Sequence, residues 1–372
     1  MKNLTLKAII IASVVSLGSC SEDEAVKPDT NNNNGNNSTS INKYSGSASY
    51  GDLVTFSIDK SNNTYTLNNE TFANTESGSF EVLSDTVFGG VYGNIFEGIY
   101  QVVANNDTFF AVELDDKIIA ANFPSGNSNN DISFGVSSEI DNSGRQSEIA
   151  GSYFYTKLGP YLNQGYPMEW GIFTAEGDSL FGTWVDEKAP VDTGFYIPLT
   201  SQNNDSSGTG FNYVYSINND RLVVSDGSST ATGYVYIGGN TSVFLIDLGT
   251  GAGSVFAYKM DESWLVNGPD DASIVGDYKY VDFETDGTKG AGNFNISSSG
   301  IITASWTDGN SVEINQASNP LVYTGYPNLY ILEDYDGAGS DIYVIFAGDA
   351  VMYFDFDGAG TFTGYGTGGK LG

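Results

Sequence analysis

The chain has no histidine, and its 372 residues include a single cysteine, Cys20. Catalytic systems that pair a serine or cysteine nucleophile with histidine are therefore excluded, as are zinc and iron sites built on histidine ligands. Because one cysteine cannot form an intramolecular disulfide, the fold must be held together by buried apolar surface. An enzyme built from this sequence would depend on a carboxylate pair, a tyrosine or lysine base, or an oxygen-ligated metal.

Basic residues are also scarce, since 14 Lys and Arg stand against 46 Asp and Glu, for a formal net charge of −32. Proteins that bind nucleic acid or anionic polymers depend on Lys and Arg to neutralise them. The charge therefore excludes nucleic acid as a partner. We interpret it as favouring solubility or salty surroundings rather than as a dedicated cation site.

The first twenty residues have the pattern of an export signal. Lys2 and Lys7 form a positive start, residues 8–17 form an apolar run, and residues 17–20 (LGSC) follow as a cleavage site. The run is too short for a stable transmembrane helix, which needs roughly 20 apolar residues. We expect residues 1–19 to be removed as a signal peptide.

Residues 17–20 closely resemble the lipobox of secreted bacterial lipoproteins, in which the cysteine is acylated, here Cys20. Residues 21–24 (SEDE) resemble the acidic export tag of surface lipoproteins of the Bacteroidota. The resemblance implies a palmitoylated lipid anchor at Cys20 and a place in the outer membrane, exposed at the cell surface. The Asn-rich remainder of residues 20–42 cannot pack and is expected to be a disordered tether.

The body of the chain has the composition and patterning of β structure. It is rich in Gly (46), Tyr (24) and Phe (22), and apolar residues alternate with polar ones over short runs. Short loops rich in Asp-Gly and Ser-Gly predict that neighbouring strands pair antiparallel in a meander. In the last hundred residues the predicted strands are 278–281, 293–296, 301–306, 311–314, 329–331, 342–346 and 351–357.

Weak self-similarity divides the body into three units, which we place at residues 43–147, 148–273 and 274–372. The matching segments are 44–47, 149–153 and 274–278 at the openings, 56–58 with 294–296, 183–186 with 305–308, and 112–114, 246–248 and 354–356 near the ends. We predict an all-β fold of three tandem antiparallel meander units, each a small barrel or sandwich with its own core. A six-bladed β-propeller is the alternative, but it requires a half-unit repeat that the sequence does not show.

Acidic pairs beside glycines are the candidate metal ligands. Asp334 and Asp336 precede one Gly-Ala-Gly segment, Asp355 and Asp357 precede another, and residues 282–287 (DFETDG) are a looser version. Residues two apart on a strand share a face, so each pair could offer oxygens to Ca²⁺, although neither segment matches an EF-hand loop. The competing interpretation is that Asp-Gly sequences form hairpin turns whose acids face water.

Aromatic side chains on loops are the candidate ligand contacts, because an aromatic face suits a sugar ring. The loop before Trp170 interrupts the second unit without a counterpart in the first, and a similar Tyr-rich loop follows in the third. The candidate residues are Trp170, Tyr161, Tyr166, Tyr323 and Tyr326. Trp184 and Trp306 recur at matching positions, which favours a shared core role over a shared site.

These features favour a lipid-anchored cell-surface binding protein for a neutral glycan or another extracellular ligand, with an extracellular glycan or protein as its partner. One alternative is a structural or adhesive surface lipoprotein without a small-molecule site. A carboxylate-pair glycosidase ranks third, because no unit concentrates acids in the sequence. We therefore expect no enzyme, assign no catalytic residue, and expect no cofactor apart from the calcium hypothesis.

Overall fold

The computed structural model describes residues 41–371 apart from 50, 84–95, 97, 105–106, 115, 126–127, 138–139, 159–168, 187–209, 220, 239–240, 250–252, 264–266, 268–269 and 326–327. The predicted signal peptide, Cys20 and most of the tether lie outside these residues. Within the described part, no helix is both long and apolar enough to cross a bilayer.

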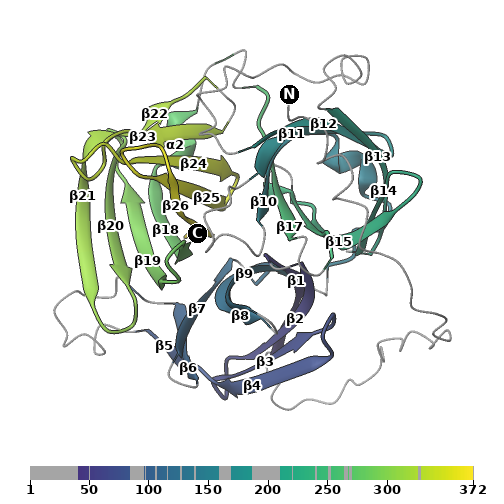
Figure 1. The fold of residues 1–372 in the computed structure, drawn as a ribbon, viewed down its shortest axis with the longest axis horizontal. Helices are drawn as coiled ribbons and strands as arrows, with labels where there is room; N and C mark the ends of the chain where they lie inside the picture. The colour runs from purple at the N-terminus through teal and green to yellow at the C-terminus, as the bar shows by residue number, and fades with distance from the viewer. Residues whose placement is uncertain are drawn as a thin grey trace, which may run out of the picture.

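The chain is nearly all β, and its strands form three antiparallel meander sheets in sequence order (Figure 1). The first sheet has nine strands in the order β4-β3-β2-β1-β9-β8-β7-β6-β5. Its strands are β1 (Ile41–Ala48), β2 (Asp52–Asp59), β3 (Thr64–Asn69), β4 (Asn74–Ser79), β5 (Glu81–Val82), β6 (Ile99–Ala104), β7 (Asp107–Leu114), β8 (Ile118–Ser125) and β9 (Ser128–Ser137).

The second sheet closes on itself as an eight-stranded barrel, because its last strand pairs with its first. A short 3₁₀ helix, η2 (Gln146–Ile149), precedes it. Its strands are β10 (Gly151–Leu158), β11 (Glu169–Glu176), β12 (Ser179–Asp186), β13 (Gly210–Asn218), β14 (Arg221–Ser225), β15 (Thr230–Tyr236), β16 (Val243–Asp247) and β17 (Ser254–Lys259).

The third sheet repeats the arrangement of the first, in the order β21-β20-β19-β18-β26-β25-β24-β23-β22, and follows a one-turn helix, α2 (Asp271–Ile274). Its outer strands β21 and β22 are not paired with each other, so the barrel keeps a seam. The strands are β18 (Gly276–Glu284), β19 (Lys289–Ile296), β20 (Ile301–Thr307), β21 (Val312–Pro320), β22 (Val322–Tyr323), β23 (Leu329–Leu332), β24 (Asp341–Ala347), β25 (Ala350–Phe356) and β26 (Phe362–Lys370).

The prediction of three tandem meander units is confirmed, and the six-bladed propeller is wrong. A propeller blade is a separate four-stranded sheet, whereas each unit here is one continuous sheet of eight or nine strands. Trp184 on β12 and Trp306 on β20 both lie on the third strand of their units, as the repeat predicted. The predicted match of residues 112–114 with 246–248 and 354–356 is one strand out of place. The latter two segments lie on or directly after the strand beside the closing strand of their unit, β16 and β25, whereas residues 112–114 lie on β7 and the corresponding strand is β8.

Alternating side chains give each unit its own core. In β10, Tyr153 and Tyr155 point into the second barrel and pack with Phe173 and Phe244, while Phe154 points outward. Comparable inner clusters fill parts of the first and third units. The period-two alternation of the strands places every second residue inside, which is the signal that the sequence carried.

The three units also share a fourth core. The prediction that each unit has its own core did not include it. Its buried side chains come from outward faces of all three units and include Phe110 and Val112 of the first, Phe154 and Phe256 of the second, and Phe354 of the third. The units accordingly surround a common centre, where the C-terminal strand also lies (Figure 1). The body is therefore one packed assembly of three barrels.

One central strand, β26, was missing from the predicted strands because its sequence is rich in glycine, which is normally depleted in strands. The structure shows why glycine is required there. A Cβ atom on Gly368 would lie 1.8 Å from the carbonyl oxygen of Lys279, and one on Gly366 would lie 2.3 Å from the ring of Tyr353. Neighbouring groups occupy the space that side chains of β26 would need.

Candidate functional site

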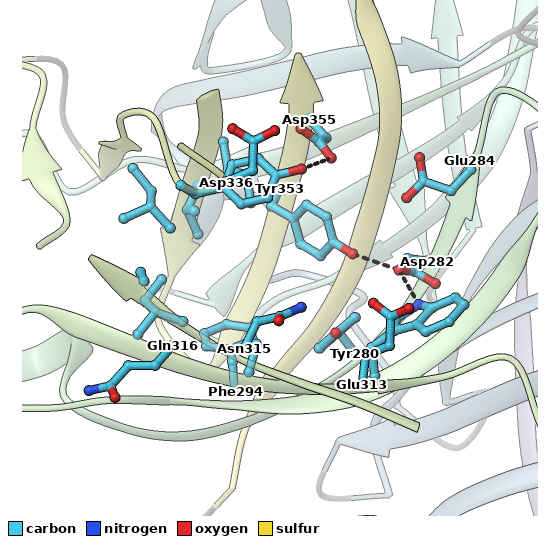
Figure 2. Close-up of a pocket in the computed structure, with 18 of the residues that line it drawn as sticks. Tyr280, Asp282, Glu284, Phe294, Glu313, Asn315, Gln316, Asp336, Tyr353 and Asp355 are labelled. Carbon is cyan, nitrogen blue, oxygen red and sulfur yellow. Dashed lines mark hydrogen bonds between the residues drawn. The ribbon is translucent and has the colours of Figure 1, made fainter. Parts of the chain in front are cut away.

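A cavity of about 630 Å³ lies inside the third unit (Figure 2). Residues of β18, β19, β20, β21, β24 and β25 line it, together with the turn that follows β23. The cavity is bordered by β21, one of the two outer strands at the seam of this sheet. Cavities of this size in proteins hold small organic ligands, so this cavity is the candidate site.

The alternation of β18 carries two acidic side chains into this interior. Tyr278 and Tyr280 belong to the inner core of the unit, and the same face continues through Asp282 and Glu284, which line the cavity. Asp355 enters from β25 in the same way. Figure 2 shows Asp282, Glu284 and Asp355 on one side of the view and the amide Gln316 on the other.

Asp282 is the most deeply buried of these acids, with 4% of its surface exposed. Its Oδ2 atom accepts hydrogen bonds from Nε1 of Trp306 over 2.9 Å and from the phenol of Tyr353 over 3.1 Å. Its Oδ1 atom has no hydrogen-bond partner of ordinary geometry among the described residues. This oxygen is enclosed beside the backbone of Gly290, and a buried carboxylate oxygen without a donor is costly, so Asp282 keeps the capacity to accept a further hydrogen bond.

Asp355 repeats this arrangement at the other end of the acidic group. The phenol of Tyr335 donates a hydrogen bond to Oδ2 of Asp355 over 2.9 Å, and Oδ1 of Asp355 has no partner within the described part of the chain. Tyr335 belongs to the turn between β23 and β24, and it also lines the cavity. Two carboxylates thus each keep one oxygen unused at the same cavity.

Burial raises the pKa of all three inward acids. It raises the pKa of Asp282 to about 7, although the hydrogen bonds from Tyr353 and Trp306 oppose the rise. Burial, followed by repulsion from Asp282 and Asp355, raises the pKa of Glu284 to about 8. Burial likewise raises the pKa of Asp355 to about 6, against the hydrogen bond from Tyr335. The interior therefore disfavours the accumulated negative charge when nothing positive is bound.

Glycines on the adjacent strands leave space for these acids. A Cβ atom on Gly290 of β19 would lie 2.0 Å from Nε1 of Trp306 and 2.5 Å from Oδ1 of Asp282. A Cβ atom on Gly364 of β26 would lie 2.4 Å from Oε2 of Glu284. Glycine at these two positions therefore leaves room for the indole of Trp306 and for the carboxylates of Asp282 and Glu284.

The first unit contains a comparable inward acid, but this acid is neutralised. The carboxylate of Glu113 on β7 receives Nζ of Lys60 over 2.9 Å and hydrogen bonds from the phenols of Tyr44 and Tyr100. By contrast, none of the residues described as lining the cavity of the third unit is Lys or Arg. Among the described residues, the inward acid of the first unit is thus paired with a lysine, whereas no lysine or arginine lines the cavity that contains the inward acids of the third unit.

The predicted aromatic site residues are not brought together in the described part of the structure. Tyr161, Tyr166 and Tyr326 lie outside the described residues. Trp170 lies on β11, paired with Thr156 and Val185, and its side chain is not described. Tyr323 lies on β22, half-buried against the core, with its ring 5.7 Å from that of Tyr330.

The predicted acid pairs have different environments within each pair. Asp334 and Asp357 accept hydrogen bonds from the backbone amides of their own turns, as does Asp336, which also borders the cavity. Asp355 instead faces the interior from β25, so Asp355 and Asp357 do not share a face. Among the described residues, no group of three or more acids, cysteines or histidines could hold a metal ion.

Sequence reasoning missed Asp282, Glu284 and Tyr353 as residues of one site, although a signal was present. The segment 282–287 was grouped with Asp-Gly turns. On β18, however, every second side chain from Tyr278 onward points into the unit, and Asp282 and Glu284 continue this alternation. Trp306 was interpreted as a core residue. It does pack against the inner core of the third unit, but its indole N–H also binds Asp282.

No family model matches the chain, and no curated protein matches it. Among solved structures, the chain is similar to transferrin binding protein B of Haemophilus parasuis, with 8% identity, a TM-score of 0.27, and coverage of 89% of this chain and 76% of that one. Transferrin binding protein B of Neisseria meningitidis gives 10% identity and a TM-score of 0.27, covering 86% and 66% of the two chains. A protein of unknown function from Nostoc punctiforme gives 9% identity and a TM-score of 0.20, covering 60% and 97%. Similarities at this level carry no argument about ligand or residues.

Proposed function

We propose that this chain is a binding protein that holds a small organic ligand inside its third unit. The observation that supports the proposal best is the cavity of about 630 Å³, which combines aromatic walls with the carboxylates of buried Asp282 and half-buried Asp355, each with one oxygen that lacks a hydrogen bond of ordinary geometry. Binding cavities typically join an apolar lining to a few polar groups that fix the ligand's orientation. The interior of the second barrel, in contrast, is occupied by a cluster of aromatic and aliphatic side chains.

A pair of variants on β20 tests whether the cavity is the binding site. Ala304 lines the cavity, whereas its neighbour Thr303 points to solvent. Ala304→Trp should fill the cavity and abolish ligand binding, and Thr303→Trp should leave binding unchanged. Binding is measured by thermal shift and calorimetry on the purified protein against a library of small metabolites, sugars and amines. Equal binding by both variants would show that the ligand sits elsewhere.

The proposal includes the predicted address, a lipid anchor on Cys20 that leaves the body outside the cell. Residues 17–24 support it through their resemblance to a lipobox and an acidic export tag. Mass spectrometry of the N-terminal peptide should show an acylated Cys20, and protease added to intact cells should cut the body. An unmodified cysteine, or a body protected from protease, would contradict this part of the proposal. The neutral glycan remains a prediction for the aromatic loops.

A second candidate function is a carboxylate-type glycosidase, and one observation now favours it more than the sequence did. The third unit gathers several acids in one cavity, among them Glu284, whose pKa of about 8 would keep it protonated at neutral pH. A protonated acid beside an ionised carboxylate is the arrangement that glycoside hydrolysis uses. Hydrolysis of aryl glycosides by the protein, lost in Glu284→Gln, would support this candidate over binding alone.

A further inference from the structure

We propose that the cavity of the third unit takes an organic cation, an ammonium group carried on an apolar or aromatic body. This inference rests on the proposed binding function and names the class of ligand. It is carried by three features of the described residues: the charges that line the cavity, the carboxylate of Asp282, and the aromatic rings beside it.

The lining carries negative charge without compensation. Five of the described residues around the cavity are acids and none is Lys or Arg. Asp282 is buried and Glu284 and Asp355 are half-buried, whereas Glu313 and Asp336 are exposed at its edge. A cavity with low-dielectric walls focuses the field of such charges, so it attracts a positive ligand and repels a negative one. A neutral ligand would leave the mutual repulsion of these acids as it is.

The carboxylate of Asp282, which lines the cavity, is the group beside which the positive group would bind. The side chain is more than nine-tenths buried, it lines the cavity, and its Oδ2 atom is already held by Trp306 and Tyr353. These two donors fix the carboxylate, and Oδ1 lies against the backbone of Gly290 without a hydrogen bond of ordinary geometry. An ammonium group has several donors and a full charge, so it would bind this carboxylate with a charge-assisted hydrogen bond.

The first unit shows that the chain can neutralise an inward carboxylate with one of its own lysines. There, Lys60 reaches Glu113 of β7 from the turn between β2 and β3. In the third unit, no lysine or arginine of the described lining takes the corresponding place beside Asp282. The ligand's ammonium would occupy the role that the Lys60 ammonium has beside Glu113.

Aromatic rings supply the rest of the proposed site. Tyr280, Phe294 and Trp306 line the cavity from β18, β19 and β20, Tyr353 lines it from β25, and Tyr335 from the turn between β23 and β24. Ring faces attract organic cations and cover apolar ligand bodies. A bare metal ion would instead need several converging oxygen ligands, and the described residues contain no such group. The lining therefore favours an organic cation over an inorganic one.

Calorimetry with matched probes tests the inference on the whole purified protein. Each pair shares a body and differs in an ammonium or a hydroxyl group: cyclohexylamine and cyclohexanol, phenethylamine and 2-phenylethanol, tryptamine and tryptophol. At a pH of about 8, at least one amine should bind about tenfold more tightly than its alcohol, which corresponds to about 1.4 kcal/mol. Amines that bind no better than their alcohols in all three pairs would overturn the inference.

Two isosteric variants on β18 locate the effect. Asp282→Asn should weaken the binding of the amine about tenfold or more and leave its alcohol within about twofold. Asp277→Asn is the control, because Asp277 is exposed on the same strand and binds Asn295 outside the cavity. Circular dichroism checks folding, and Asp355→Asn, expected to act in the same direction, takes the place of Asp282→Asn if that variant does not fold. Equal losses for the Asp277 and Asp282 variants would overturn the inference.

Failure of the ligand class is distinguishable from failure of the site. If alcohols or neutral sugars bind as tightly as the amines and Ala304→Trp abolishes their binding, the proposed function stands and the cation is wrong. If the amines bind but Ala304→Trp and Asp282→Asn have no effect, the binding lies outside the cavity and both proposals are wrong.

Discussion

Tyr153 and Tyr278 make the same hydrogen bond in two different units. Each phenol donates to the carbonyl oxygen of the residue four positions earlier, Ile149 or Ile274, and both distances are 2.8 Å. In each unit the acceptor ends the short helix before the first strand, and the donor lies on that strand. The bond therefore fixes the entry of the chain into the barrel, and its repetition shows that the two units share a structural device beyond their strand order.

Removing this bond should cost the two units similar amounts. Tyr153→Phe and Tyr278→Phe each leave a buried carbonyl oxygen without its donor, and we expect each to lower the free energy of unfolding by about 1 kcal/mol. Urea denaturation of the two single variants and the double variant measures the cost. Because the sites lie in different units, the costs should add in the double variant. A cost near zero in either variant would show that the bond does not stabilise that entry.

Phe154 belongs to the core that the three units share, and its ring lies 6.4 Å from that of Phe354 across the boundary between the second and third units. Phe154→Ala should lower the free energy of unfolding by about 3–5 kcal/mol, because the side chain is buried in the shared core. The loss falls on contacts between units, so calorimetric unfolding should broaden or split into more than one transition. Phe173→Ala is the control, since Phe173 is equally buried but packs inside the second barrel.

In that control the second barrel should be weakened while the contacts between the units remain. A single, unshifted transition in Phe154→Ala would contradict the shared core as a source of stability.

The meander could be predicted from alternation, but the docking of the units could not. Tyr153, Phe154 and Tyr155 form a continuous apolar run, and such a run indicates a strand buried on both faces. The inner face is explained by the barrel that the strand helps to form. The outer face requires a partner from a distant part of the sequence, and a single sequence does not name it.

The acidic interior was partly visible in the sequence and was assigned to the wrong local structure. The Asp-Gly pattern correctly predicts a turn at Asp357, where glycine and carboxylate both serve the hairpin. At Asp282 the same pattern begins four residues before the turn, so the acid lies in the strand, and parity decides its direction. The net charge of the chain was equally uninformative. A sum over all residues does not show that several acids line one cavity, or that no Lys or Arg is among its described lining residues.

Calcium removal should leave the protein unchanged. The carboxylates of Asp334, Asp336 and Asp357 already accept hydrogen bonds from backbone amides of their own turns, which accounts for their place beside glycines. We expect the melting temperature to be the same within about one degree with excess chelator and with added calcium at neutral pH. A rise with calcium that Asp357→Asn removes, but Asp277→Asn does not, would instead show that the acidic turns bind the ion.

Stability of the empty protein should fall as the pH rises through neutrality. Burial raises the pKa values of Asp282, Glu284 and Asp355 to about 7, 8 and 6, while in the unfolded chain such groups titrate near 4. Between these limits the folded state binds more protons than the unfolded state, so the free energy of unfolding decreases with pH and levels off above the folded values. We expect a decrease on the order of a few kcal/mol between about pH 5.5 and about pH 8.5.

Urea denaturation across this range measures the effect, and the variants identify its origin. Asp282→Asn should flatten the curve and make the protein relatively more stable at the alkaline end, because an amide has no proton to lose. Asp277→Asn should leave the slope as it is, since Asp277 is exposed. The exposed turn carboxylates, such as Asp357, have lowered pKa values and act in the opposite direction only below about pH 4, outside the window. Two results would contradict this explanation: a free energy of unfolding that rises with pH from about 5.5, or a pH dependence that Asp282→Asn leaves unchanged. Either would show that the raised pKa values of these acids do not control stability in this range.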